Sequence, residues 1–395
     1  MPDRFGLRAM LAVGGAVVAA ATVAVPGAAA AGSPQAIGGS QLSGHGVVVD
    51  YGSGRSRPGL PGVKAFAFVI ADAGTGQVLA AKDPHGWYRP ASTLKVLTAV
   101  ALIPLLNPDA TVVASKQATS VPANVVGLIT GHAYRISDLF TALLTISAND
   151  AAVALTQATG SFGQGMAAIN AEARHLQADD TVAVQPNGLD APGQRTSAYD
   201  LALIARQALR QPAFMKYDQT IAAKFPVSVK KSVTLFNQNS LLTSYPGGIG
   251  GKIGWTSAAD ATYVGMARRN GVTLIVTLLH CPALTEIDTA KTLLNWGFAV
   301  DGKVPGVGTL VSALGVGTAA GSPASASAVA SAGAGGHGAR AAGGGSGLVA
   351  SNPSVLAAGF SCVALIAAGI GFAYNRRQRP SARNRGGPRG PRGPA

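Results

Sequence analysis

The chain of 395 residues is long enough for one large domain or two ordinary ones, but Gly-, Ala- and Ser-rich ends leave less material for a packed core. Seven arginines in the last twenty residues supply half of the formal net charge of +14, and the remainder is too diffuse to require a nucleic-acid partner. Two cysteines, Cys281 and Cys362, are too few for a disulfide framework. The six histidines lack the spacing of a zinc hydrolase, so we expect no metal and no other cofactor.

The first segment, residues 1–31, has the parts of a secretory signal peptide. Arg4 and Arg8 precede a short apolar stretch that ends in small residues, which is the pattern that signal peptidases cut. An uncleaved membrane anchor is the alternative, although the apolar stretch is short for a span. Residues 32–62 are rich in Gly, Ser and Pro without periodicity, so we expect a flexible leader.

A folded domain is predicted over residues 63–300. Two strands come first, then a buried helix beginning near Ala91, then several helices, then two strands joined by Asn270-Gly271, and then a last helix. The expected ranges in chain order are 64–71, 77–81, 91–103, 137–144, 150–159, 162–176, 198–209, 262–268, 272–280 and 286–298. This order predicts an α+β domain in which an antiparallel sheet joins early and late strands and a helical cluster packs against it.

The C-terminal part has the features of a membrane anchor joined to the folded domain by a linker. Residues 301–353 are an Ala/Gly/Ser-rich linker, and residues 354–374 are uncharged and apolar. A helix of that length spans about 31 Å, which matches a bilayer core of about 30 Å. The arginine-rich tail 375–395 should stay cytoplasmic next to such a transmembrane helix. We therefore expect a single-pass plasma-membrane protein whose folded domain is extracytoplasmic.

Ser92-Thr-Leu-Lys95, at the start of the buried helix, is the first candidate for chemistry. Residues three apart on a helix share a face, so the amine should lie beside the hydroxyl. A serine hydroxyl is a weak nucleophile until a base takes its proton, and burial favours the neutral form of lysine that can do so. The spacing alone is weak, because Ser228-Val-Lys-Lys231 repeats it where no helix is expected.

Two further polar clusters lie in the same domain. Ser147 and Asn149 stand at a junction between two predicted helices, where small polar side chains can face a cleft. Lys252 lies among glycines in the stretch 247–256, just before the last two strands, where glycine would let the backbone approach a ligand closely.

These three clusters together resemble the penicillin-binding serine D-alanyl-D-alanine carboxypeptidases, most closely the membrane-anchored actinobacterial type. The three signatures of that family are Ser-x-x-Lys, Ser-x-Asn and Lys-Thr-Gly, and they are matched in order by Ser92-Thr-Leu-Lys95, Ser147-Ala-Asn149 and Lys252-Ile-Gly254. The likeness extends over about residues 46–300 and includes Pro186-Asn-Gly-Leu-Asp190. It implies a penicillin-binding or β-lactamase-like transpeptidase fold.

The resemblance also implies roles for the reacting groups. Ser92 would attack the terminal amide of a peptidoglycan stem peptide ending in D-Ala-D-Ala, and Lys95 would be its general base. Ser147 would pass a proton to the leaving amine. Backbone N–H groups of Ser92 and Trp255 would hold the oxyanion. β-Lactam antibiotics would acylate the same serine.

Substrate binding is implied for a second set of residues. Asn149 would hold the substrate amide. Lys252, on the same strand as Gly254 and Thr256, would attract the free carboxylate of the substrate. Ile253 departs from the family pattern, because it replaces a threonine whose hydroxyl helps to bind that carboxylate. A lost hydrogen bond to a charged group costs about 1.5–3 kcal/mol, and Thr256 could partly replace it.

Three alternatives remain open at this point. A class A β-lactamase shares the serine and lysine but needs a deacylating glutamate, and Glu172 lies in an ordinary helical stretch. An activity-impaired, membrane-tethered wall-binding protein is supported by Ile253. A D,D-endopeptidase would use the same groups on cross-bridges, so the sequence does not separate it from a carboxypeptidase.

Overall fold

The computed structural model describes residues 36–53 and 57–315. An antiparallel sheet with the strand order β1-β3-β2-β10-β9-β8 organises this region, and a short strand, β11, pairs with β3. Its strands are β1 (Val47–Val49), β2 (Ala67–Asp72), β3 (Gln77–Lys82), β8 (Gly248–Thr256), β9 (Asp260–Arg269), β10 (Val272–Cys281) and β11 (Gly308–Thr309). Early and late strands meet where β2 pairs with β10, as the sequence predicts.

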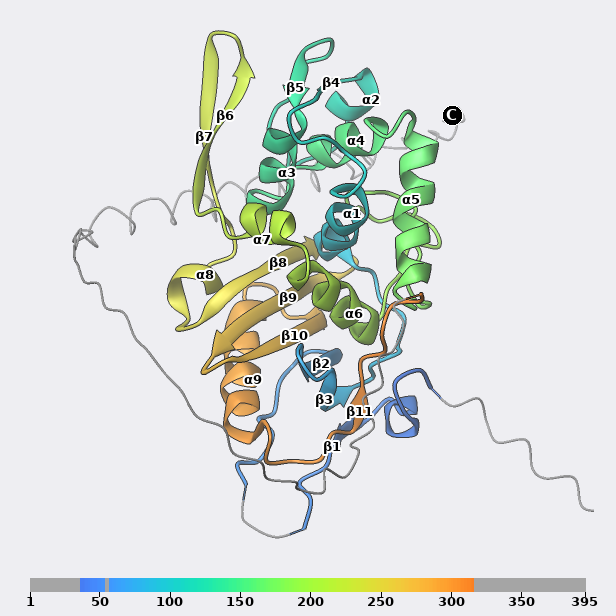
Figure 1. The fold of residues 1–395 in the computed structure, drawn as a ribbon, viewed down its shortest axis with the longest axis vertical. Helices are drawn as coiled ribbons and strands as arrows, with labels where there is room; N and C mark the ends of the chain where they lie inside the picture. Colours follow the sequence, from blue (N-terminus) through green and yellow to red (C-terminus); the bar gives the residue numbers. More distant parts are fainter. Residues whose placement is uncertain (1–35, 54–56, 316–395) are drawn as a thin grey trace, which may run out of the picture. The chain divides into compact units, whose positions relative to one another are not determined.

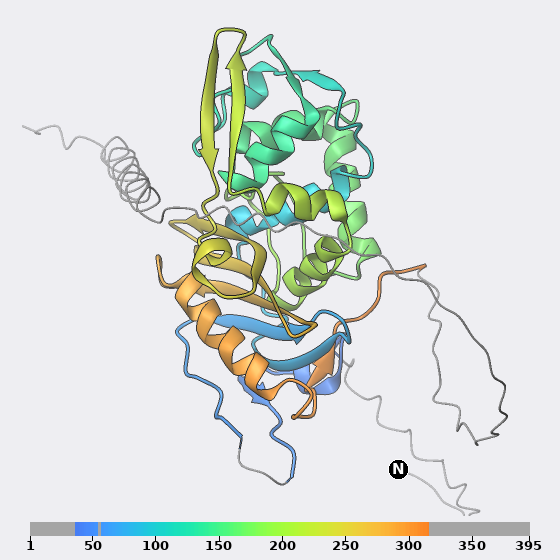
Figure 2. The ribbon, with the colours of Figure 1, turned by 60° about the vertical axis from the view of Figure 1, so that its left-hand side comes forward.

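The sheet has a helix layer on each face (Figures 1 and 2). One face packs on α9 (Glu286–Val300), and the other packs on α6 (Ala198–Leu209). Successive side chains of a strand point to opposite faces, so β2 feeds both cores: Val69 joins the large helical cluster, while Phe68 joins the cluster beneath α9. This double coverage explains why every residue of β2 is buried and why the strand is apolar up to Asp72, its last residue.

A helical lobe lies beyond α6 and is built around α1 (Leu94–Leu102), all of whose residues are buried. A helix surrounded on all sides is expected to be apolar all round, and α1 departs from this at Lys95 and Thr98. The other helices of the lobe are α2 (Lys116–Thr119), α3 (Ile136–Thr145), α4 (Asn149–Gln157), α5 (Phe162–His175) and α7 (Pro212–Asp218). Two small antiparallel sheets belong to it as well: β4 (Thr111–Val113) pairs with β5 (Ala133–Arg135), and β6 (Ala222–Ser228) forms a hairpin with β7 (Lys231–Phe236). Short helices η1 (Ser40–Ser43), η2 (Ala91–Thr93) and α8 (Leu241–Ser244) complete the order.

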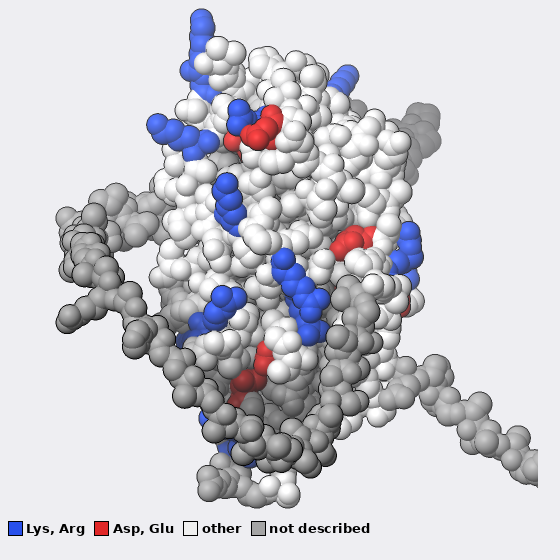
Figure 3. Space-filling view, in the orientation of Figure 1, with Lys and Arg blue, Asp and Glu red and all other residues white. Residues whose placement is uncertain are grey.

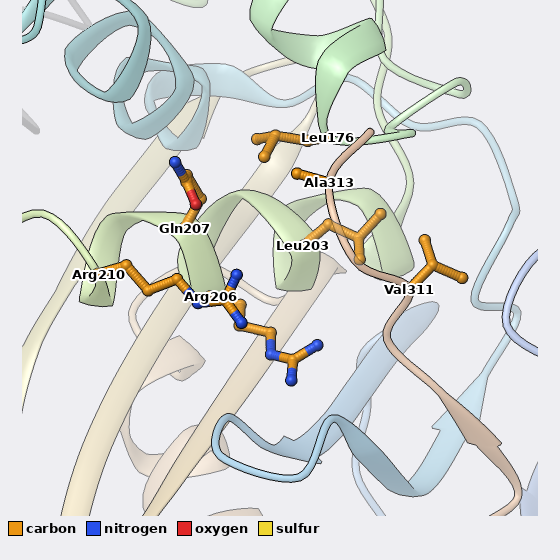
Figure 4. Close-up of a pocket in the computed structure, with 7 residues that line it drawn as sticks. All are labelled: Leu176, Leu203, Arg206, Gln207, Arg210, Val311 and Ala313. Atoms are coloured by element: carbon orange, nitrogen blue, oxygen red, sulfur yellow. The ribbon is translucent and has the colours of Figure 1, made fainter. Parts of the chain in front are cut away.

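The domain is longer at both ends than the predicted range 63–300. In the predicted leader, η1 buries Leu42 completely and β1 joins the sheet. At the other end, residues 301–315 include β11 and continue across α6 (Figure 4). Arg206 of α6 donates to the backbone oxygen of Leu310 at 2.8 Å. Composition alone made both segments look like linkers, but each has a few apolar side chains that the core accepts.

The described ranges 36–53 and 57–315 contain no helix long and apolar enough to cross a membrane. The predicted signal peptide 1–31, transmembrane helix 354–374 and tail 375–395 all lie outside those ranges. On the face seen in Figure 3, the Lys and Arg side chains are scattered over a largely uncharged surface. Lys95 and Lys252 do not contribute to that surface, because they are 0% and 2% exposed.

Candidate active site

The backbone around Ser92 is held in an unusual shape by its neighbours. Ala91 has a positive φ of 45°, and the short helix η2, which contains Ser92, leads directly into α1. Pro90 O accepts from the hydroxyls of Thr93 at 2.6 Å and Thr262 at 2.8 Å. A side chain at Gly188 would collide with the Ala91 carbonyl oxygen, since an added Cβ would lie 1.8 Å from it. The turn that presents Ser92 is therefore fixed from three directions.

Lys95 lies directly beside Ser92. Its Nζ is 2.9 Å from Ser92 Oγ, 2.7 Å from Asn149 Oδ1 and 2.6 Å from Asn187 O. Two of these partners are carbonyl oxygens, which can only accept, whereas the serine hydroxyl can also donate. A charged amine would donate to all three oxygens, whereas a neutral amine has two N–H donors for the carbonyl oxygens and a lone pair that can accept from the Ser92 hydroxyl.

The electrostatics favour that neutral amine. Burial holds the pKa of Lys95 well below its usual value, and the positive charge of Lys252 lowers this pKa further, while Asp150 opposes the shift. The arrangement can therefore remove a proton from the Ser92 hydroxyl near neutral pH.

Ser147 and Asn149 lie at the junction of α3 and α4. Ser147 has a positive φ of 63° and is 3% exposed, and its Oγ has no hydrogen-bond partner among the described residues. Asn149 Nδ2 donates to Pro122 O at 2.9 Å, while its Oδ1 faces Lys95. Buried hydroxyls are normally bonded, so Ser147 Oγ is available to a substrate or water.

The loop beside this junction is tied to α4 by one carboxylate. Asp150 accepts from the backbone N–H groups of Val126, Gly127 and Leu128 at 3.0, 2.9 and 3.0 Å. The side chain is 1% exposed, and these bonds satisfy its buried charge.

Strand β8 brings Lys252 and Gly254 to the serine. A Cβ added to Gly254 would lie 2.7 Å from Ser92 N and 2.9 Å from Thr93 N, so strand and turn touch through backbone atoms. Lys252 Nζ donates to Ile253 O at 2.8 Å. Burial lowers the pKa of Lys252 to about 7, against the opposing charge of Asp218.

The remaining predicted residues of β8 are placed differently from one another. Trp255 is 56% exposed. Thr256 Oγ1 donates to Asp190 Oδ1 at 3.2 Å and accepts from Ala259 N at 3.0 Å. Ile253 packs against the hydrophobic cluster beneath α9. The Thr256 hydroxyl is thus already hydrogen-bonded within the protein, and the Ile253 side chain packs in the core.

The repeated Ser-x-x-Lys spacing at Ser228 is not part of the site. Ser228 ends β6 and Lys231 begins β7, where the two residues face each other across the hairpin turn. Three residues with direct effects on the site were given no role from the sequence. Asn187 and Gly188 belong to the stretch 186–190 that resembles the family, and their Asn-Gly turn signal indicates a tight turn without indicating that it contacts Lys95 and Ala91. Asp218, which acts on Lys252, lies at the end of an ordinary helix and gives no local signal.

The described residues contain no cluster of His, Cys, Asp or Glu that could hold a metal ion. Residues 54–282, more than half of the chain, match the family described as D-alanyl-D-alanine carboxypeptidase. The chain belongs to this family. All of the site residues described above lie inside the matched range.

Relatives of the D-alanyl-D-alanine carboxypeptidase family cover the same region. D-alanyl-D-alanine carboxypeptidase DacB2 of Mycobacterium tuberculosis is 39% identical over 248 residues, which is 61% of this chain and 85% of the relative. Two further curated relatives are longer, and the chain spans 62% and 64% of their lengths.

Solved structures agree with the fold. A D-alanyl-D-alanine carboxypeptidase from M. tuberculosis H37Rv superposes with a TM-score of 0.62 at 37% identity, covering 66% of this chain and 99% of that one. Penicillin-binding protein 6B from Escherichia coli gives 0.56 at 28% identity, covering 62% and 82%. The fold is therefore the penicillin-binding, transpeptidase type, with its antiparallel sheet and helical lobe.

Proposed function

We propose that this protein is a serine-type D-Ala-D-Ala carboxypeptidase that removes the terminal D-alanine from peptidoglycan stem peptides. The observation that carries the proposal is the buried amine of Lys95, 2.9 Å from Ser92 Oγ and otherwise bonded to two carbonyl oxygens. Family membership supports the same chemistry.

Acylation begins at Ser92. Its Oγ attacks the carbonyl carbon of the penultimate D-Ala while Lys95 Nζ takes the hydroxyl proton. The oxyanion is held by the backbone N–H groups of Ser92 and Trp255, and the close approach of Gly254, the neighbour of Trp255, to the Ser92 backbone supports this assignment. The C–N bond then breaks, and Ser147 Oγ gives its proton to the departing amine of the terminal D-Ala while it takes up the proton that Lys95 removed from Ser92, so Lys95 is neutral again. Water hydrolyses the ester on Ser92 and regenerates the hydroxyl.

Recognition of the peptide end uses the opposite wall. Lys252 in its charged form attracts the free carboxylate, and Gly254 keeps that part of β8 free of a side chain. Asn149 orients the substrate amide, while the Thr256 hydroxyl, which is bonded to Asp190 and Ala259, would have to exchange its bond to Asp190 in order to reach the carboxylate. β-Lactams place a carboxylate and a strained amide in the same positions. Their amine stays tethered to the acyl group after ring opening, so the acyl-enzyme persists.

The proposed location is the outer face of the plasma membrane. The signal-peptide pattern of residues 1–31, the apolar stretch 354–374 and the arginine-rich tail 375–395 support a single-pass anchor with the catalytic domain toward the cell wall. Peptidoglycan stem peptides are reached on that side. Protease treatment of intact protoplasts should degrade the domain while sparing the tail, and a domain protected from protease would contradict this location.

Labelling with a fluorescent penicillin tests the activity. The full chain should form a covalent adduct that Ser92→Ala abolishes and Ser228→Ala leaves unchanged. A wall-binding protein without catalysis, which Ile253 favours, would give no adduct. Mass spectrometry of muropeptides after incubation then separates the two peptidase activities. Loss of single D-alanine residues supports the carboxypeptidase, whereas cleavage of cross-bridges without that loss would indicate the endopeptidase.

A further inference from the structure

Asp218, the last residue of α7, is a buried carboxylate outside the signature motifs. It is 0% exposed. Its Oδ2 accepts from the backbone N–H of Gly251 at 2.7 Å, while its Oδ1 has no partner among the described residues. A buried carboxylate with a free oxygen is expensive unless a positive charge compensates it.

The backbone of β8 is shaped around this carboxylate. The register with β9 shifts between Gly248 and Gly250. A Cβ added to Gly250 would lie 2.3 Å from Asp218 Oδ2, and Gly251 has a φ of 140°, a conformation that side-chain-bearing residues rarely adopt. The glycines therefore allow α7 to place a carboxylate against the strand, directly before Lys252.

A buried ammonium such as that of Lys252 is costly unless a nearby negative charge compensates it. It is 2% exposed, and the hydrogen bond that its ammonium donates goes to the neutral oxygen of Ile253. Of the elements that pack on β8, η2 and α8 carry no charged side chain. From α1, Lys95 contributes an amine that burial and Lys252 keep largely neutral, so it supplies no negative charge. The phenol of Tyr263 on β9 is uncharged at neutral pH because burial holds its pKa well above 10. Asp218 is the acidic group whose charge acts on Lys252.

We propose that Asp218 is a positioning residue that keeps the Lys252 ammonium charged, and so controls how well the site holds a substrate carboxylate. The inference rests on the proposed function. Asp218 does not touch the substrate, and it acts through charge across the glycines of β8. In support, burial lowers the pKa of Lys252 to about 7 and raises that of Asp218 to about 7, so each group titrates near neutral pH and depends on the other.

The sign of the effect follows from this coupling. Lys252 binds a carboxylate in its protonated form, so binding weakens as pH rises through its pKa. The negative charge of Asp218 raises that pKa. Asp218→Asn keeps an acceptor for the Gly251 N–H but removes the charge, and a lost neighbouring charge shifts a pKa by about one to three units. The alkaline limb of activity should therefore move to lower pH by about one unit or more.

The experiment measures KM and kcat of the full-length enzyme against pH for an acylated D-Ala-D-Ala peptide and for its C-terminal amide. In Asp218→Asn we expect KM for the free acid to rise at least tenfold on the alkaline side, with kcat changed less than threefold. The amide should show no such pH-dependent change, because it offers no carboxylate. Asp200→Asn is the matched control, since Asp200 is also a buried carboxylate and lies on α6. Its alkaline limb should stay in place.

Gly250→Ala is a second test that keeps Asp218 intact. Its methyl group would displace the carboxylate, so the alkaline limb should shift in the same direction, and this remains readable if Asp218→Asn does not fold. An unshifted limb in a folded variant, or an equal loss for acid and amide, would overturn the role of Asp218. Failure of the proposed function is recognised separately, because the wild-type chain would then form no penicillin adduct at all.

Discussion

Gly254→Ala tests the contact on which the proposed oxyanion site depends. An added methyl carbon would lie 2.4 Å from Thr262 Oγ1, 2.7 Å from Ser92 N and 2.9 Å from Thr93 N. Two of these three atoms are backbone atoms of the turn that carries the nucleophile. They cannot rotate away, so β8 must separate from η2 by several tenths of an ångström or more.

Two measurable losses follow from that separation. Overpacking a tight contact costs about 1–3 kcal/mol. At about 2–4 °C per kcal/mol for a domain of this size, the melting temperature should fall by roughly 2–12 °C. Moving one of the two N–H donors away from the oxyanion should slow acylation about 10²- to 10³-fold. If the variant remains folded, its loss of stability alone should hardly change the labelling rate. A 10²- to 10³-fold slower rate would then come from the displaced N–H donor.

The assay is the rate of fluorescent-penicillin labelling together with thermal unfolding. Gly163→Ala is the control, because an added Cβ in α5 meets its nearest neighbour, Ser161 Oγ, at 4.0 Å. Alanine within a helix stabilises by about 0.5–1 kcal/mol, so this variant should label normally. If Gly254→Ala labelled at the wild-type rate with an unchanged melting temperature, the strand and the turn would not be in the contact described.

Four further outcomes are expected. Ser92→Ala should give no penicillin adduct, while Ser228→Ala should label fully; an adduct on the first variant would move the nucleophile elsewhere. Acylation should slow as pH falls through the lowered pKa of Lys95, because protonation occupies the lone pair of the base, and a flat acid limb would exclude that role. Ile253→Thr should lower the melting temperature and change the acylation rate less than threefold, since the isoleucine packs beneath α9; a large gain in rate would mean that its hydroxyl reaches the site. A chain cut after residue 300 should lose several kcal/mol, because each buried Val or Leu of the removed segment contributes about 1.5–3 kcal/mol, and unchanged unfolding would show that this segment is dispensable.

Local patterns were sufficient for some elements. α6 begins and ends at the predicted residues, 198 and 209, because an apolar stripe follows Ser197, whose hydroxyl caps the helix by accepting from Asp200 N. Asn270 and Gly271 both have positive φ between β9 and β10, as a two-residue hairpin turn requires. In these cases the residues that determine the structure are neighbours in sequence.

Other features depend on partners far away in the chain. The glycines of 247–256 were interpreted as room for a ligand, but Gly250 and Gly254 are close to the protein's own Asp218 and Ser92. Lys252 was expected to be a simple cation, yet its charge depends on that buried carboxylate. The segment 301–315 has the composition of a linker, but it is ordered because Arg206 of α6 donates a hydrogen bond to its backbone and because its strand β11 pairs with β3. No window of sequence contains such information.

The pairing of β2 with β10 joins Asp72 to Leu274, so the sheet closes only when most of the chain is present. Contacts between such distant residues form slowly and late. Ser92 is synthesised early, whereas β8, the strand that lies against it, follows about 160 residues later in the chain. A truncated product would carry an intact Ser-x-x-Lys and still be inert. Capture by a β-lactam consequently reports completed folding of the whole domain, and it distinguishes mature molecules from fragments in a mixed population.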